Sequence, residues 1–192
     1  MEDLYAPLLE LAQRRKSCRH FSAEPVSDEL VGQILAVASR APFASGRNNW
    51  KIAAVRDPQA IATLSAQVRD SAAAICAQLD AGIEPFFRRY AESFTFFEGA
   101  PVLLIPYCRE TSTMKSMLRD NVTPEILAWE HDNLTKSLSC AGMMILLAAE
   151  SLGLGACYMT GPLLAGSALN ATLGLRDNFL LGAVIPVGYP VK

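Results

Sequence analysis

The sequence predicts a single α+β domain in which helices cover both faces of a sheet, giving three layers. Segments with helical spacing of apolar residues are interspersed with four short apolar runs that predict strands. These segments lack the regular strand–helix–strand alternation that is typical of parallel α/β proteins. The chain has 192 residues, 51% of them hydrophobic, and no linker-like stretch, so we expect residues 1–192 to share one core.

The first half of the chain is expected to form three helices and one strand. Leucines near helical spacing predict a helix over residues 3–16. Ser27 is placed to cap a second helix, which continues to about Arg40 and stops before a proline. Residues 50–55 are typical of a strand, and Asp57 precedes a third helix that has proline in its first position.

The second half is expected to contain one long helix and three more strands. Residues 85–98 are rich in aromatic side chains, and we expect them to be irregular. The long helix starts after Thr123, is expected to break near Asp132, and ends at Gly153. The other expected elements are strands at 102–108, 156–159 and 180–187 and a helix at 163–173 that Gly174 ends.

The composition argues against several classes of protein. The formal net charge is −2, so the chain lacks the global positive field of a nucleic-acid-binding protein. The number of cysteines is five, and none form a Cys-x-x-Cys pair, which argues against a zinc knuckle and a disulfide framework. The N-terminal residues begin acidic and lack a basic leader before an apolar run, so we expect no signal peptide and a cytoplasmic location.

The most apolar stretch, residues 138–149, predicts a helix that is buried on all sides. It is too short to cross a bilayer, and Lys136 and Glu150 flank it closely. Such a helix can be buried in the core of the domain or in a subunit interface. A chain of this size buries it more easily by pairing with a second copy, so we expect an obligate homodimer.

A cationic segment follows the first expected helix. Arg14, Arg15, Lys16 and Arg19 surround Ser17, where the helix gives way to extended chain. Guanidinium, ammonium and hydroxyl groups suit a phosphate or another anion. The same pattern also fits a solvated basic helix end, which interacts favourably with the helix dipole.

Two further segments have the composition to contact a flat ligand. Residues 41–50 form a small polar loop, in which amide side chains and free backbone N–H groups can read the edge of a planar heterocycle. Residues 153–162 end a strand at Thr160 and Gly161, and Gly161 has no side chain to keep a ligand from the backbone. Taken alone, the segment 41–50 is better explained as an ordinary helix-to-strand connector, and 153–162 is also explained as a simple turn.

The order and spacing of these segments resemble the nitroreductase family. That family opens with Arg-x-Ser-x-Arg-x-Phe, here at 15–21, and continues with an Ala-Pro-Ser-x-x-Asn-x-Gln-Pro-Trp loop, here at 41–50. A Leu-Gly-Leu-Gly turn at 152–155 and a Pro-x-Gly-Tyr-Pro ending at 186–190 complete the pattern. The resemblance spans nearly the whole chain, with a less typical middle, and implies a three-layer α/β/α nitroreductase-like fold with a central mixed, mainly antiparallel sheet.

The resemblance also implies FMN as the cofactor, held at the interface of a homodimer. Arg15, Lys16 and Ser17 would hold the phosphate and ribityl chain. Arg19 would face the N1–O2 edge of the flavin, where negative charge appears on reduction. The set is completed by Thr160 and Gly161 beside N5 and the dimethylbenzene ring, by Phe43, Ala44, Ser45 and Asn48 reaching across from the second subunit, and by Pro42 and Met159 of the same two segments.

The activity that the resemblance implies is ping-pong hydride transfer from NAD(P)H to nitroaromatics, quinones or similar flat acceptors. The reaction needs no protein nucleophile and no metal, so we assign no catalytic residue and no metal ligand. Two alternatives stay open: a flavin-binding sensor or carrier without turnover, and a specialised member such as a dehalogenase or azoline oxidase. Substrate-facing residues are expected in 85–98 and 109–123.

The chain departs from the family pattern at four places. Phe43 stands where serine is common, residues 46–49 replace the Asn-x-Gln-Pro portion, and Met144 stands where asparagine is common. The Lys-x-Arg that follows Gly-Tyr-Pro in the family and clamps the phosphate has no counterpart before Lys192. Either the cationic segment suffices, together with Lys192, or FMN is held more weakly.

Cys18, His20 and His131 raise a different class of site, a thiol enzyme or a metal centre. The sequence provides no cluster of Asp, Glu, His and Cys around them that would hold a metal ion, so we expect neither.

Overall fold

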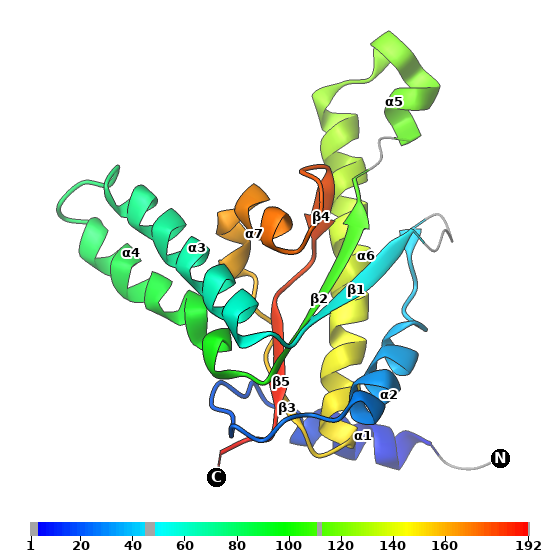
Figure 1. Ribbon diagram of the computed structural model, residues 1–192. Coiled ribbons are helices and arrows are strands. Elements are labelled where there is room, and N and C mark those ends of the chain that lie inside the picture. The colour runs from blue at the N-terminus through cyan, green and yellow to red at the C-terminus, as the bar shows by residue number, and fades with distance from the viewer. Residues whose placement is uncertain (1–3, 45–48, 111–112, 192) are drawn as a thin grey trace.

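The computed structural model describes residues 4–44, 49–110 and 113–191, which fold into three layers (Figure 1). Helices α2 (Asp28–Ala38) and α6 (Pro124–Ser151) pack against one face of a central sheet. Helices α3 (Pro58–Cys76) and α7 (Ser167–Thr172) lie over the other face. The three-layer architecture expected from the sequence is confirmed.

The sheet has five strands in the described residues, and β2 is paired on both sides. The strands are β1 (Trp50–Val55), β2 (Val102–Arg109), β3 (Gly155–Ala156), β4 (Phe179–Leu181) and β5 (Ile185–Gly188). Their order is β1-β2-β5-β3, with β4 paired to the end of β2 that β5 leaves free. All four ladders are antiparallel, and an isolated parallel bridge joins Ser17 to Ala156. The sheet is therefore mixed and mainly antiparallel, as expected.

Side-chain caps start three of the helices where the sequence predicts. The Ser27 hydroxyl accepts the N–H of Leu30 at 3.2 Å and begins α2. The Asp57 carboxylate accepts the N–H of Gln59 at 3.1 Å and begins α3. Thr123 caps α6 in the same way. Each cap satisfies a backbone donor that the first helical turn leaves unpaired.

Two expectations about helices are wrong. Residues 85–98 are not irregular: they form α4 (Glu84–Ala91) and a 3-10 helix (Glu92–Gly99). Burial of Phe94 and Phe97 against the sheet holds this aromatic segment in helical form. Helix α6 does not break near Asp132, whose carboxylate pairs with Lys136 at 2.5 Å one turn later on the exposed face.

The C-terminal region is more divided than its sequence suggests. The strand expected at 180–187 is two strands: the N–H of Gly182 still donates to Pro106 of β2, but that of Val184 leaves β2 and donates to Met159. The helix expected at 163–173 is interrupted at Gly166, which has a φ of +49°. It comprises a 3-10 helix (Gly161–Ala165) followed by α7.

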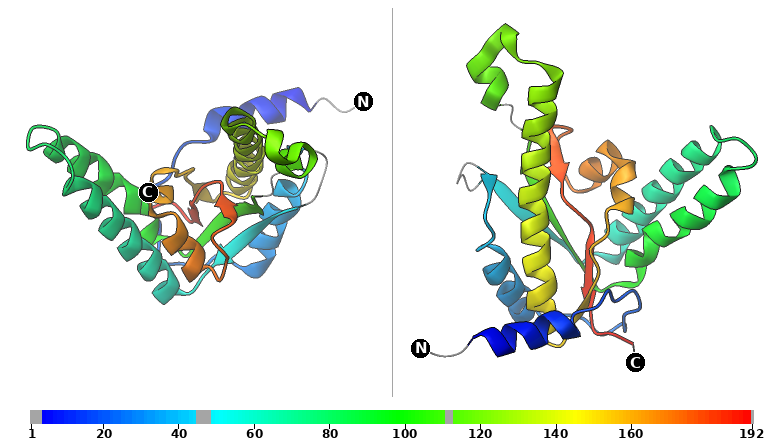
Figure 2. Two further views of the ribbon diagram at one scale, coloured as in Figure 1. Left: turned by 90° about the horizontal axis from the view of Figure 1, so that it is seen from above. Right: turned by 180° about the vertical axis from the view of Figure 1, so that it is seen from behind.

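The remaining elements lie at the periphery. Helix α1 (Tyr5–Arg14) crosses one end of α6 in Figure 2. Helix α5 (Thr113–Leu118) and a 3-10 turn (Arg119–Asn121) were not expected, and the Glu130 carboxylate of α6 caps α5 by accepting the N–H of Thr113 at 2.6 Å. Among the helices that the structure describes, none has both the length and the apolar character needed to span a membrane.

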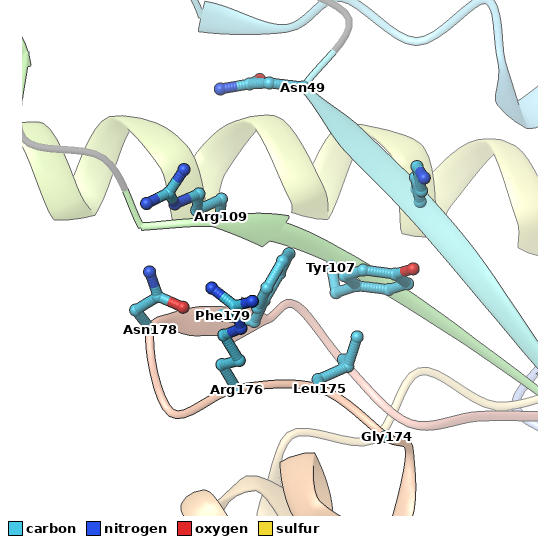
Figure 3. A pocket seen from close by; sticks show the side chains of 9 residues that line it. Asn49, Tyr107, Arg109, Gly174, Leu175, Arg176, Asn178 and Phe179 are labelled. Carbon is cyan, nitrogen blue, oxygen red and sulfur yellow. The ribbon is translucent and has the colours of Figure 1, made fainter.

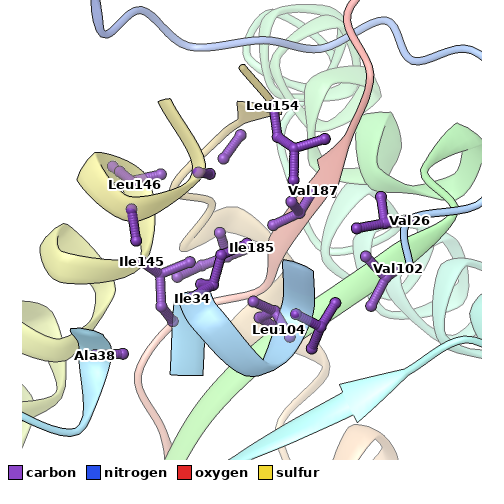
Figure 4. Close-up of a cluster of buried hydrophobic side chains, with 14 of the residues drawn as sticks. Val26, Ile34, Ala38, Val102, Leu104, Ile145, Leu146, Leu154, Ile185 and Val187 are labelled. Carbon is purple, nitrogen blue, oxygen red and sulfur yellow. The ribbon is translucent and has the colours of Figure 1, made fainter. Parts of the chain in front are cut away.

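The sheet separates two hydrophobic clusters. The first lies under α2 and α6 and is shown in Figure 4, with Ile34, Leu104, Ile145 and Ile185 fully buried at its centre. The second lies under α3 and α7 on the opposite face. The apolar stretch 138–149 is mostly buried against the first cluster, so its burial in the core is confirmed for most of its residues.

Two glycines allow α6 to approach the sheet closely. A Cβ atom on Gly142 would lie 2.3 Å from the ring of Tyr158, and one on Gly182 would lie 2.6 Å from the Cβ of Leu138. The Tyr158 hydroxyl donates to Ser139 of α6 at 3.1 Å and lies 3.2 Å from the carbonyl oxygen of Gly182. The contact between helix and sheet therefore has no room for an added methyl group.

This packing predicts opposite effects for two helix-interior glycines. Gly142→Ala should lower the free energy of unfolding by about 1–2 kcal/mol, because overpacking outweighs the gain in helix propensity. Gly32→Ala in α2 should raise it by up to about 1 kcal/mol, because nothing lies within 4 Å of the added Cβ. Chemical denaturation of both variants measures the difference, and equal changes would contradict this account of the α6 contact.

Candidate functional site

The cationic segment lies in extended form beside strand β3. Ser17 bridges Ala156, and the N–H of Cys18 donates to the Ala156 carbonyl at 2.9 Å. Further along, Phe21 bridges Pro190. Residues 17–21 thus add to the edge of the sheet, which fixes the backbone of the segment while its side chains remain accessible.

The charged side chains of this segment differ in whether an ion pair matches their charge. Arg14 is paired with Glu150 at 3.4 Å and with Glu10 at 3.6 Å, so its charge is largely matched. Within the described residues, Arg15, Lys16 and Arg19 take part in no ion pair. Lys16 and Arg19 are exposed and Arg15 is half-buried. Three unmatched cations therefore remain available to an anion.

A cavity of about 460 Å³ opens beside the segment. Its walls include Lys16, Ser17 and Arg19 on one side and the turn at 153–155 on the other. A Cβ atom on Gly155 would lie 2.6 Å from the sulfur of Cys18. Glycine at this position therefore lets the segment approach the sheet.

The strand end at 159–161 joins the cationic segment through β3. Met159 is buried and exchanges backbone hydrogen bonds with Val184, whereas Thr160 is exposed. A Cβ atom on Gly161 would lie 2.3 Å from the ring of Phe94. The structure therefore brings two of the three predicted segments to one edge of the sheet. It also brings the aromatic segment against Gly161, a contact that the sequence reasoning missed.

The described residues of the third predicted segment, the loop at 41–50, pack against α6 and not beside the cationic segment. Phe43 stacks on Trp50, with ring centroids 6.0 Å apart and planes 8° apart, and packs against Leu134 and Leu138 of α6. The N–H of Ala44 donates to the buried Ser137 hydroxyl at 3.0 Å. Pro42 is exposed beside them. Ser45 and Asn48 lie outside the described residues.

The two parts of the predicted site lie at opposite ends of the molecule. In Figure 1, α1 and β3 mark the end that carries the cationic segment. The start of β1, which follows the predicted loop, lies at the other end of the sheet. One chain alone therefore does not bring residues 42–44 to residues 15–19.

The donor set at the first part suits a phosphorylated flat ligand. Two guanidinium groups, an ammonium group and a hydroxyl provide charged hydrogen bonds for a phosphate. The Thr160–Gly161 backbone follows β3, and the Phe94 ring covers the side-chain position of Gly161, so any contact with a flat ligand comes from the rest of this backbone. These residues fit a flavin mononucleotide, which combines a phosphate with a planar ring.

The thiol and metal alternatives find no support in the described residues. The thiol of Cys18 donates to the carbonyl of His20 at 3.3 Å, and His131 lies against Glu110 at 2.6 Å instead. Burial raises the pKa of the Cys108 thiol to about 11, with a smaller contribution from the Glu110 charge, so this cysteine stays a neutral thiol. No group of three or more His, Cys, Asp or Glu side chains that could hold a metal occurs in the part of the chain that the structure describes.

A model of the nitroreductase family matches residues 12–189, and the chain belongs to that family. An NADH dehydrogenase of Thermus thermophilus is 24% identical over 200 residues, covering 94% of this chain and 85% of the relative.

Solved structures show the same fold. A BluB-like flavoprotein of Clostridium difficile 630 has a TM-score of 0.83 and 23% identity, covering 100% of this chain and 91% of that one. An iodotyrosine deiodinase solved with FMN and 3-iodo-L-tyrosine has a TM-score of 0.71 and 22% identity, covering 96% of this chain and 90% of that one.

The position of Phe43 predicts a structural role in addition to any contact with a ligand. Phe43→Ser should lower the free energy of unfolding by about 1–3 kcal/mol, because it removes the stack on Trp50 and leaves a gap against α6. Phe86→Ser, at a ring that is 78% exposed, should change it by less than about 0.5 kcal/mol. Chemical denaturation compares the two, and an unchanged Phe43→Ser protein would show that the ring stabilises nothing.

Proposed function

We propose that the chain is an FMN-dependent oxidoreductase that transfers hydride from NAD(P)H to flat acceptors such as nitroaromatics and quinones, and that it works as a homodimer. The observation that carries the proposal is the bridge between Ser17 and Ala156, which sets an unmatched cationic segment beside β3, a few residues before the strand end at 159–161. Membership of the nitroreductase family and the FMN bound in the solved iodotyrosine deiodinase support the same cofactor.

Different residues would bind different parts of FMN. Arg15, Lys16 and Ser17 would hold the phosphate through charged hydrogen bonds and a hydroxyl contact. Arg19 supplies the positive charge that stabilises negative charge on the ring after reduction. When bound, FMN supplies the ring that accepts a hydride and passes it on. The Thr160–Gly161 backbone, which Phe94 packs against from within the chain, would contact the ring.

A homodimer accounts for the separation of the predicted segments. Two chains in opposite orientation along α6 would bring residues 42–44 of each to the cationic segment of the other. The outward face of α6 suits such a contact, because Cys140, Met143 and Leu147 recur at helical spacing and Met143 is 44% exposed. Met144, in contrast, packs against the first core cluster, so it belongs to the core.

Exposed leucines on α1 extend this apolar surface. Leu8 is 57% and Leu9 42% exposed, on a helix that crosses one end of α6 (Figure 2). Apolar side chains grouped in this way are typical of a protein interface.

The five cysteines are free thiols, which fits a reducing, cytoplasmic setting.

A dehalogenase is the second candidate. An iodotyrosine deiodinase shares the fold over 96% of this chain. A dehalogenase would use the same contacts to the flavin. The two activities would differ in which acceptors the reduced flavin reacts with. A flavin carrier would share the contacts as well and would show no turnover.

Flavin titration tests the binding half of the proposal. Arg15→Gln and Arg19→Gln should each weaken FMN binding by about tenfold or more, because each removes a charged hydrogen-bond donor. Arg89→Gln, at an exposed arginine of α4, is the matched control and should bind as the unmodified protein does. Calorimetry gives the affinities, and unchanged binding in both site variants would remove the assignment.

Flavin absorbance during turnover tests the other half. FMN-loaded protein should bleach on addition of NADPH and recover on addition of a quinone or nitroaromatic, with parallel lines in double-reciprocal plots. Iodotyrosine should be a poor acceptor. Bleaching without recovery would indicate a carrier, recovery with iodotyrosine alone would indicate a dehalogenase, and intersecting lines would contradict the ping-pong order.

A further inference from the structure

A second cavity, of about 430 Å³, lies where β1 begins and β2 ends, and Figure 3 shows the side chains that line it. Strands β1, β2 and β4 and the loop before β4 form its walls. Its volume falls in the range of small-molecule sites. The residues that matter for its chemistry are Asn49, Lys51, Tyr107, Arg109, Arg176 and Phe179.

The charge of this cleft is of one sign. Lys51, Arg109 and Arg176 come from three different elements, and among the described residues that line the cavity none is a carboxylate. Within the described residues none of the three takes part in an ion pair, and the nearby Glu110 is turned to His131. Three unmatched cations around one opening create a focused positive potential that favours a multiply charged anion.

One wall of the cleft is aromatic. Tyr107 and Phe179 meet edge to face, with ring centroids 5.7 Å apart, and both rings are half-buried. Leu175 lies beside them and packs with Tyr107 against the second core cluster. Ring faces held in this way can stack with a planar ligand.

Hydrogen bonds from two sides fix the loop that carries Arg176. The side-chain amide of Asn170, which is 4% exposed, donates to the carbonyl of Phe179 at 2.9 Å and to that of Arg176 at 3.3 Å. On the other side, the N–H of Glu110 donates to the carbonyl of Asn178 at 2.8 Å. The cleft is therefore largely formed before a ligand arrives, which lowers the entropic cost of binding.

We propose that this cleft binds a nucleoside monophosphate, with the phosphate held by Lys51, Arg109 and Arg176 and the base against Tyr107 and Phe179. A phosphomonoester carries up to two negative charges, which suits three cations better than a single carboxylate does. The amides of Asn49 and Asn178 at the rim can bond either a base edge or the phosphate. None of Arg15, Lys16, Ser17 and Arg19 lines the cleft, although Asn49 belongs to the predicted loop at 41–50 and Arg109 begins the segment expected to face the substrate.

The test titrates FMN-saturated protein with 5′-AMP by calorimetry, with adenosine and inorganic phosphate as separate probes. This step rests on the proposed function, by which FMN fills the cationic segment, so that binding which persists reports on another site. We expect 5′-AMP to bind more tightly than either probe, and the Arg109→Gln/Arg176→Gln double variant to lose affinity by about tenfold or more. Arg89→Gln should leave it unchanged.

Three outcomes would overturn the proposal. They are no binding of 5′-AMP to the unmodified protein, binding that FMN abolishes, and equal affinity in the unmodified protein and the double variant. The thermal unfolding of the double variant is compared with that of the unmodified protein, so that a loss of affinity cannot be ascribed to misfolding. Both arginines are exposed, so we expect the two curves to coincide.

Discussion

The close contact between α6 and the sheet is the constraint on which the rest of the molecule depends. Gly142 and Gly182 lie where a larger residue would clash with Tyr158 or Leu138, and the Tyr158 hydroxyl contacts both Ser139 of α6 and the Gly182 carbonyl. A helix of 28 residues is thereby fixed along the whole molecule. Its middle supports the loop at 42–44 through Ser137, and its end leads directly into β3. One helix thus sets the positions of both parts of the predicted flavin site.

The cationic segment is accessible and yet ordered, because it lies at the edge of the sheet. Extended residues 17–21 take part in bridges to Ala156 and Pro190, so their backbone is fixed by the sheet. Lys16 and Arg19 remain exposed, and their charges are unmatched within the described residues. Unmatched cations grouped at one place repel one another, so they do not stabilise the fold. They do attract an anion. The arrangement is therefore better explained by binding than by stability.

Local signals predicted much of this fold. The caps at Ser27, Asp57 and Thr123 act within three residues, and the structure bears them out. The helical state of 85–98 depends on burial of Phe94 and Phe97 against distant residues, which no local pattern contains. The division of the last strand depends on the hydrogen bond from Val184 to Met159, a partner elsewhere in the chain. For the same reason the motifs indicated the cationic segment, while the cleft around Arg109 and Arg176, whose residues lie far apart in the sequence, went unnoticed.

The central claim is that two chains complete one flavin site. Sedimentation velocity with detection at both protein and flavin absorbance tests it most directly, on the unmodified protein and on Met143→Glu. We predict a flavin-loaded dimer for the first and a folded monomer without flavin for the second. Ile83→Glu places the same charge at a 56% exposed residue next to α4, across the sheet from α6, and should stay a flavin-loaded dimer. A monomer of either protein that sediments with bound FMN would contradict the claim.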